Sequence, residues 1–82
     1  MVMYEAGMLA RSKAGHDKAQ IYIIKEVDDT YVYLVDGRIR TLGHPKKKKK
    51  KHVQIVHGIY NMNELDDAGI RKLIKDWMKE EK

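Results

Sequence analysis

Apolar and polar residues alternate along the first 57 residues in short runs, and residues that favour turns separate these runs. Such alternation is typical of β-strands with one buried face. The pattern predicts five short strands, at residues 7–11, 19–27, 30–35, 38–42 and 52–56. Because an open sheet of this size leaves its edges exposed, closure into a small barrel is the economical arrangement.

Turn signals separate the middle strands. Asp28 and Asp29 follow the second strand and predict a turn. Asp36 and Gly37 follow the third, and an Asp-Gly pair is a strong signal for a two-residue type I′ hairpin, which needs positive φ at both central residues. We therefore expect residues 38–42 to return as the fourth strand.

The periodicity becomes helical after residue 62 and predicts an α-helix over roughly residues 64–80. Asn63 is the expected N-cap, with Asp66 three residues later as its capping-box partner. Gly69 weakens the helix by about 1 kcal/mol relative to alanine. The apolar stripe comprises Ile70, Leu73, Ile74, Trp77 and Met78.

The 82 residues suffice for one domain with a thin core. We expect residues 1–58 to form a small SH3-like barrel, mainly β, and residues 59–82 to form an amphipathic helix packed on it. The alternative for the helix is that its Trp77 stripe docks a protein partner or a second copy.

The charge is concentrated in the first part of the chain, and this suggests a polyanionic partner. The whole chain carries +5, whereas residues 1–58 carry 12 basic against 6 acidic residues. Six consecutive lysines occupy residues 46–51. They are either a solvated loop or a clamp for phosphates, and we favour the clamp because close like charges repel unless a polyanion relieves them.

Several functional classes find no support in the sequence. Cysteine is absent, which excludes disulfides and thiolate sites and favours an intracellular, cytoplasmic protein. Neither a signal peptide nor a membrane span is indicated. The four histidines lack metal-site spacing, and no motif of catalysis or cofactor binding occurs. We expect neither a metal nor a cofactor, and no enzyme activity.

Residues 5–57 resemble a KOW motif and its continuation in the ribosomal protein L fourteen e family of the large subunit. The stretches that carry the resemblance are GMLARSKAGHDKAQIYIIKEVDDTYVYLVDG and RIRTLGHPKKKKKKHVQIV. The family implies an SH3-like barrel that contacts ribosomal RNA. Gly15 matches the central KOW glycine, and Pro45 with the lysines matches the basic segment. His16 and Ala19 depart from the arginine and glycine that are common in the family.

The resulting hypothesis is non-catalytic binding of RNA, most simply ribosomal RNA, by a monomer that does not contact membranes. Ribosomal proteins are further candidate partners, and a protein-interaction adaptor that uses the barrel and the helix is the alternative. The candidate RNA-binding residues are Lys13, His16, Lys18, Arg38, Arg40, Lys46, Lys47, Lys48, Lys49, Lys50, Lys51 and His52. The candidate loop-shaping residues are Gly15, Asp17, Asp36 and Gly37.

Tyr31 and Tyr33 share one strand face, opposite Val32 and Leu34. They could stack on unpaired bases. Amphipathic packing on the barrel or under the helix is the commoner role for such tyrosines, and we favour it.

Overall fold

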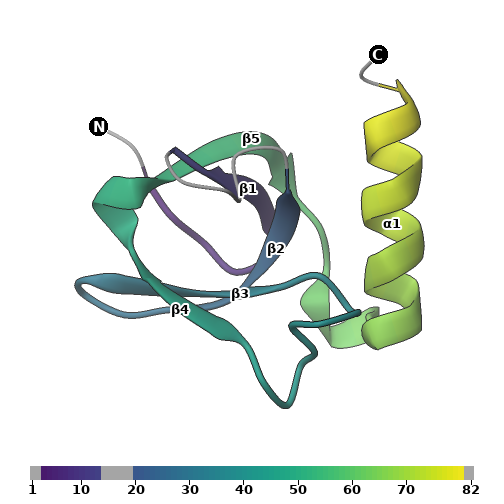
Figure 1. Cartoon of the computed structure of the whole chain (residues 1–82), viewed down its shortest axis with the longest axis horizontal. Coiled ribbons are helices and arrows are strands. Elements are labelled where there is room, and N and C mark those ends of the chain that lie inside the picture. The colour runs from purple at the N-terminus through teal and green to yellow at the C-terminus, as the bar shows by residue number, and fades with distance from the viewer. Residues whose placement is uncertain (1–2, 14–19, 81–82) are drawn as a thin grey trace.

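The computed structural model describes residues 3–13 and 20–80 and confirms a mainly β fold. Five antiparallel strands curl into a partly open barrel, and one helix stands beside it (Figure 1). The elements are β1 (Met8–Ser12), β2 (Ile21–Val27), β3 (Tyr31–Val35), β4 (Lys46–Lys49), the 3₁₀ turn η1 (Lys50–His52), β5 (Val53–Ile59), the 3₁₀ turn η2 (Met62–Glu64) and α1 (Asp67–Glu80).

The sheet has the strand order β4-β3-β2-β1-β5. The first four strands form a meander, and β5 then returns to pair with β1. Register shifts in the β1–β5 and β2–β3 ladders accompany the curl of the sheet. This order leaves β4 and β5 as the two edge strands.

The central strand β2 is buried on both faces, which explains its nearly continuous apolar sequence. On the inner face, Tyr22 and Ile24 join a cluster with Ala10, Val32, Leu34 and Val53. On the outer face, Ile21 and Ile23 join Leu9, Val35 and two helix residues, Ile70 and Ile74. The helix thus completes a second core layer, and full burial of one such isoleucine stabilises the fold by about 1.5–3 kcal/mol.

The prediction of a strand at residues 38–42 is wrong. These residues form a compact loop, because the Asp36 carboxylate competes with a strand ladder for their amides. Its Oδ1 accepts hydrogen bonds from the backbone amides of Arg38 and Arg40 at 2.9 and 3.0 Å. The Leu42 amide donates to Oδ1 of Asp67 at 2.8 Å, which fastens the loop to the start of α1.

The type I′ turn at Asp36-Gly37 is also wrong. Gly37 has a φ of +78°, but within the described residues no residue other than glycine has positive φ, so Asp36 does not meet the requirement of that turn. The Asp-Gly signal located a chain reversal, and the buried Asp36 carboxylate determined its shape.

The helix begins later than predicted, and its N-cap is Asp66 rather than Asn63. Oδ1 of Asp66 accepts a hydrogen bond from the Gly69 amide at 2.7 Å. Asn63 lies instead in η2, where its own amide donates to Oδ1 of Asn61. Both residue types suit a cap, and the half-buried Leu65, which packs against the outer core, fixes the helix start after η2. No helix of the described residues is long and apolar enough to cross a membrane.

We predict that Asp66→Ala lowers the free energy of unfolding by about 1 kcal/mol, because one amide at the helix start loses its acceptor. Asn63→Ala should change it by only a few tenths of a kcal/mol, as its side chain is not the cap. Urea denaturation followed by circular dichroism measures both. Equal losses in the two variants would contradict the assignment of the cap.

Candidate nucleic-acid interface

The six lysines lie in regular structure and not in the solvated loop that was the alternative to a phosphate clamp. Residues 46–49 are the edge strand β4, and Lys50 and Lys51 open η1. β4 pairs with β3 so that Lys46, Lys47 and Lys48 lie opposite Leu34, Tyr33 and Val32. The ladder therefore fixes the backbone of a row of lysines along one edge of the barrel.

The pleat of β4 divides its lysines between the two faces of the sheet. Lys47 and Lys49 are exposed on the face of Tyr31 and Tyr33, whereas Lys46 and Lys48 are half-buried on the inner face. Side chains on one face of a strand are about 6.6–6.8 Å apart. Successive phosphates along one nucleic-acid strand have a similar spacing, so exposed lysines of β4 can meet neighbouring phosphates.

Tyrosine rings lie next to three of the lysine ammonium groups. Nζ of Lys47 is 4.3 Å from the centroid of the Tyr31 ring. Nζ of Lys46 is 5.8 Å from the centroid of the Tyr22 ring, and Nζ of Lys50 is 5.9 Å from that of Tyr4. All three distances fall within the range of cation–π attraction. The rings thus restrict where these ammonium groups lie, and Tyr31 serves in the structure as a platform for Lys47.

The η1 turn is tied to two other parts of the barrel. The Lys50 ammonium donates to the Asp29 carbonyl at 3.1 Å, and the Tyr4 hydroxyl donates to the Lys50 carbonyl at 3.0 Å. The Lys13 amide donates to the His52 carbonyl at 2.9 Å, so the end of β1 lies beside η1. Lys13, Lys51 and His52 are exposed there.

Asp28, one of the acidic side chains near this strand, is committed to the β2–β3 turn. Its Oδ1 accepts the amides of Tyr31 at 2.6 Å and Thr30 at 2.9 Å, and its Oδ2 accepts the Tyr33 hydroxyl at 3.1 Å. These amides, that hydroxyl and the charge of Lys47 lower the pKa of Asp28 from its ordinary 3.8. The hydrogen bond to Asp28 raises the pKa of Tyr33.

We predict that the Asp28 carboxyl titrates below pH 3.8 in the folded protein. A lowered folded pKa contributes stability that is complete above the unfolded pKa and is lost as the pH falls through the folded value. Asp28→Asn removes this charge, so the stability advantage of the wild type should shrink below about pH 4. Carboxyl NMR titration and acid denaturation measure this, and a midpoint above 3.8 would contradict it.

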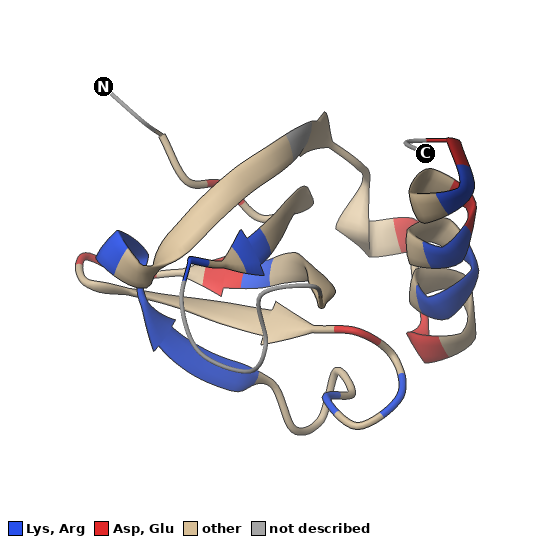
Figure 2. Ribbon diagram, turned by 45° about the horizontal axis from the view of Figure 1, so that its top comes forward, with Lys and Arg blue, Asp and Glu red and all other residues tan. Residues whose placement is uncertain are grey.

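The remaining candidate residues separate into two places. Figure 2 shows β4 and η1 on the side of the barrel away from α1. Lys13 and His52 join this side through their backbone contact. Arg38 lies instead in a groove against α1, and Arg40 is half-buried in the same loop. Gly15, His16, Asp17 and Lys18 lie outside the described residues.

The candidate residues chosen from the sequence omit two groups, the tyrosines beside the lysines and the cations of α1. Tyr4 and Tyr22 lie next to the ammonium groups of the lysine segment, and only the folded barrel brings them there. The cations Arg71, Lys75 and Lys79 recur every four residues along α1. That spacing places them on one helix face and was visible in the sequence.

No protein-family model and no curated protein matches this sequence. The resemblance to KOW proteins across residues 5–57 therefore stays a prediction from the sequence. Among residues 3–13 and 20–80, no group of three or more His, Cys, Asp or Glu side chains could hold a metal ion.

Proposed function

We propose that the protein is a non-catalytic RNA-binding protein that contacts the phosphate backbone through β4 and η1. The observation that carries the proposal is an edge strand made of four lysines, which continues into two more. Lysine is a compact cation on a flexible stem, suited to contact with phosphate whatever the base sequence. A row of such cations fits a polyanion with regularly spaced charges.

Protection of the sheet edge is the simplest purely structural explanation of these lysines. Lysine on an edge strand does discourage pairing with other chains. Each further lysine, however, adds Coulomb repulsion between near neighbours. The six-lysine segment exceeds the needs of edge protection, and a bound polyanion would relieve its repulsion.

Ribosomal RNA is the proposed natural ligand, on the strength of the family resemblance across residues 5–57. Lys13 and His52, which meet beside η1, would extend the basic surface from β4 toward the end of β1. Phosphate contacts position a protein without reading bases. Recognition would therefore depend on the shape of a folded RNA, against which the row of ammonium groups has to fit.

The test is co-sedimentation of the tagged protein with ribosomal particles, combined with binding to isolated ribosomal RNA. We expect comigration with large-subunit particles at low salt, and affinity for the RNA at least tenfold above that for polyglutamate of equal charge. Equal affinity for RNA and polyglutamate would refute a role in RNA binding. Protein left at the top of the gradient even at low salt would refute the ribosomal assignment.

A further inference from the structure

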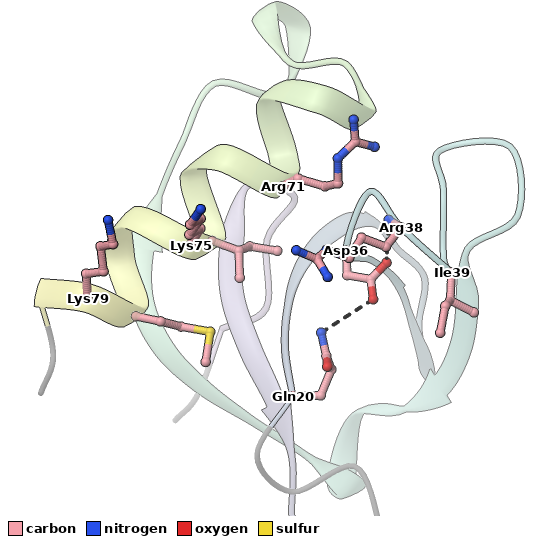
Figure 3. A pocket seen from close by; sticks show the side chains of 9 residues that line it. Gln20, Asp36, Arg38, Ile39, Arg71, Lys75 and Lys79 are labelled. Atoms are coloured by element: carbon pink, nitrogen blue, oxygen red, sulfur yellow. Dashed lines mark hydrogen bonds between the residues drawn. The ribbon is translucent and has the colours of Figure 1, made fainter.

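A groove of about 580 Å³ separates α1 from the loop that follows β3. Figure 3 shows Arg71, Lys75 and Lys79 along the helix and Asp36, Arg38 and Ile39 across from them. Gln20, Ile74 and Met78 complete the lining. The groove is thus formed by α1 and the loop after β3, and Figure 2 shows β4 on the side of the barrel away from α1.

The apolar part of the groove contains two large side chains that remain open to solvent. Ile39 is 83% exposed and Met78 is 46% exposed, whereas Ile74 at 6% belongs to the core. Met78 extends the apolar stripe of α1 beyond the residues that pack on the sheet. Exposed apolar side chains that gather in one groove are typical of an interaction site.

The rim of the groove is positively charged. Arg71, Lys75 and Lys79 follow one another at intervals of four residues, an arrangement that destabilises an isolated helix slightly through repulsion. Arg38 faces them from the loop. The one acid in the lining, Asp36, already accepts the amides of Arg38 and Arg40 and the side-chain amide of Gln20.

The two walls of the groove are held together without a ligand. Nη1 of Arg71 donates a hydrogen bond to the Gly37 carbonyl, and the Leu42 amide donates to Asp67. The groove is therefore formed in advance, which lowers the entropic cost of binding. Arg38, Lys75 and Lys79 remain exposed beside it.

We propose that this groove binds an acidic amphipathic segment of another protein. Aliphatic side chains of the segment would pack on Ile39, Ile74 and Met78, and its carboxylates would face the cations of the rim. The lining contains no aromatic ring, so it lacks the stacking surface that unpaired bases use. An aliphatic floor between cations is complementary to a peptide that combines leucine or isoleucine with glutamate or aspartate.

This inference is independent of the proposed RNA binding, because it uses none of the lysines of β4 and η1. The groove is lined by α1 and the loop after β3, whereas β4 lies on the side of the barrel away from α1 (Figure 2). RNA and the acidic segment should therefore bind at the same time. The protein would then link an RNA to an acidic protein. Failure of either site leaves the other intact.

The experiment uses the full chain, labelled with ¹⁵N, and two synthetic helical peptides about four turns long. One carries leucines on one face and glutamates elsewhere; the other has the same charge, with glutamine in place of each leucine. We expect the leucine peptide to shift the amide signals of Ile39, Lys75 and Met78 and to bind at least tenfold more tightly than the glutamine peptide.

Single substitutions distinguish the two contributions. Ile39→Ser removes an exposed apolar contact and should weaken binding about tenfold. Lys75→Glu should weaken it about fivefold at low salt and less at high salt. Lys72→Glu is the matched control, because Lys72 is exposed on the same helix but lines a different hollow with Asp76 and Glu80; it should change affinity less than twofold.

Three outcomes would overturn the proposal. Equal binding of the two peptides would reduce the site to nonspecific charge attraction. A single-stranded RNA that shifts the groove signals and displaces the leucine peptide would assign the groove to nucleic acid. Shifts at Ile39 and Met78 that grow with protein concentration, without peptide, would assign it to a second copy of the chain.

Discussion

Replacement of Lys47, Lys49 and Lys51 by threonine is expected to lower the affinity for structured RNA about 100-fold at ~0.1 M salt. Each phosphate contact changes the logarithm of the affinity by about 0.7–0.9 per tenfold change in salt. Three lost contacts therefore remove about two log units at that concentration. The slope of the logarithmic salt plot should become shallower by about 2–3, measured by fluorescence anisotropy over a series of salt concentrations.

These three lysines are chosen because they are exposed, and their described internal interactions are limited to the Lys47–Tyr31 pair and the attraction between Lys47 and Asp28. Lys50, by contrast, donates to the Asp29 carbonyl and helps to hold η1. Threonine favours β-structure, so β4 should keep its ladder with β3. Because lysine also protects a sheet edge, sedimentation must show that the variant stays monodisperse.

The matched control removes the same charge from the helix. Lys72→Gln, Lys75→Gln and Lys79→Gln together should lower RNA affinity less than about threefold, since screened charges beyond a Debye length contribute little. Equal losses in the two triple variants would mean that affinity follows net charge, and β4 would then have no special role.

The elements that the sequence predicted correctly are those in which the spacing of apolar residues reflects which side chains are buried. β2 and β3 were found because Ile21, Ile23, Val32 and Leu34 alternate or cluster as buried strands do. The helix was found because its apolar residues recur with the helical period. The helix start was missed, because Asn63 and Asp66 are both good caps and the tertiary packing of Leu65 decides between them.

The fourth strand could not be predicted, because its residues carry no β-pattern of their own. Lysine has a weak preference for strands, and six identical residues have no periodicity. What makes Lys46–Lys49 a strand is the unpaired edge of β3, which no local pattern reveals. The same limit applies to the α1 groove, whose walls come from loop residues and helix residues more than thirty positions apart in the chain.

Gly37→Ala is expected to lower the free energy of unfolding by about 3 kcal/mol. The φ of Gly37 is +78°, a conformation that costs an alanine about 1–2 kcal/mol. A Cβ there would also lie 2.3 Å from the Asp67 carbonyl oxygen and 2.9 Å from Cγ of Arg71. Because the first neighbour is backbone, the loop has to move away from α1 and lose the Leu42–Asp67 and Arg71–Gly37 hydrogen bonds.

Gly43→Ala is the control for Gly37→Ala, because Gly43 lies in the same connection between β3 and β4. Nothing lies within 4 Å of a Cβ at Gly43, and its φ is not positive, so its stability should change by less than about 1 kcal/mol in urea denaturation. Where Gly37→Ala remains folded, this variant should bind the leucine peptide more weakly, because the groove wall has moved. The same variant should keep its RNA affinity, because β4 is held by its ladder with β3. Equal stability of the two variants would show that the loop does not depend on Gly37, and a parallel loss of RNA and peptide binding would show that the two surfaces are coupled.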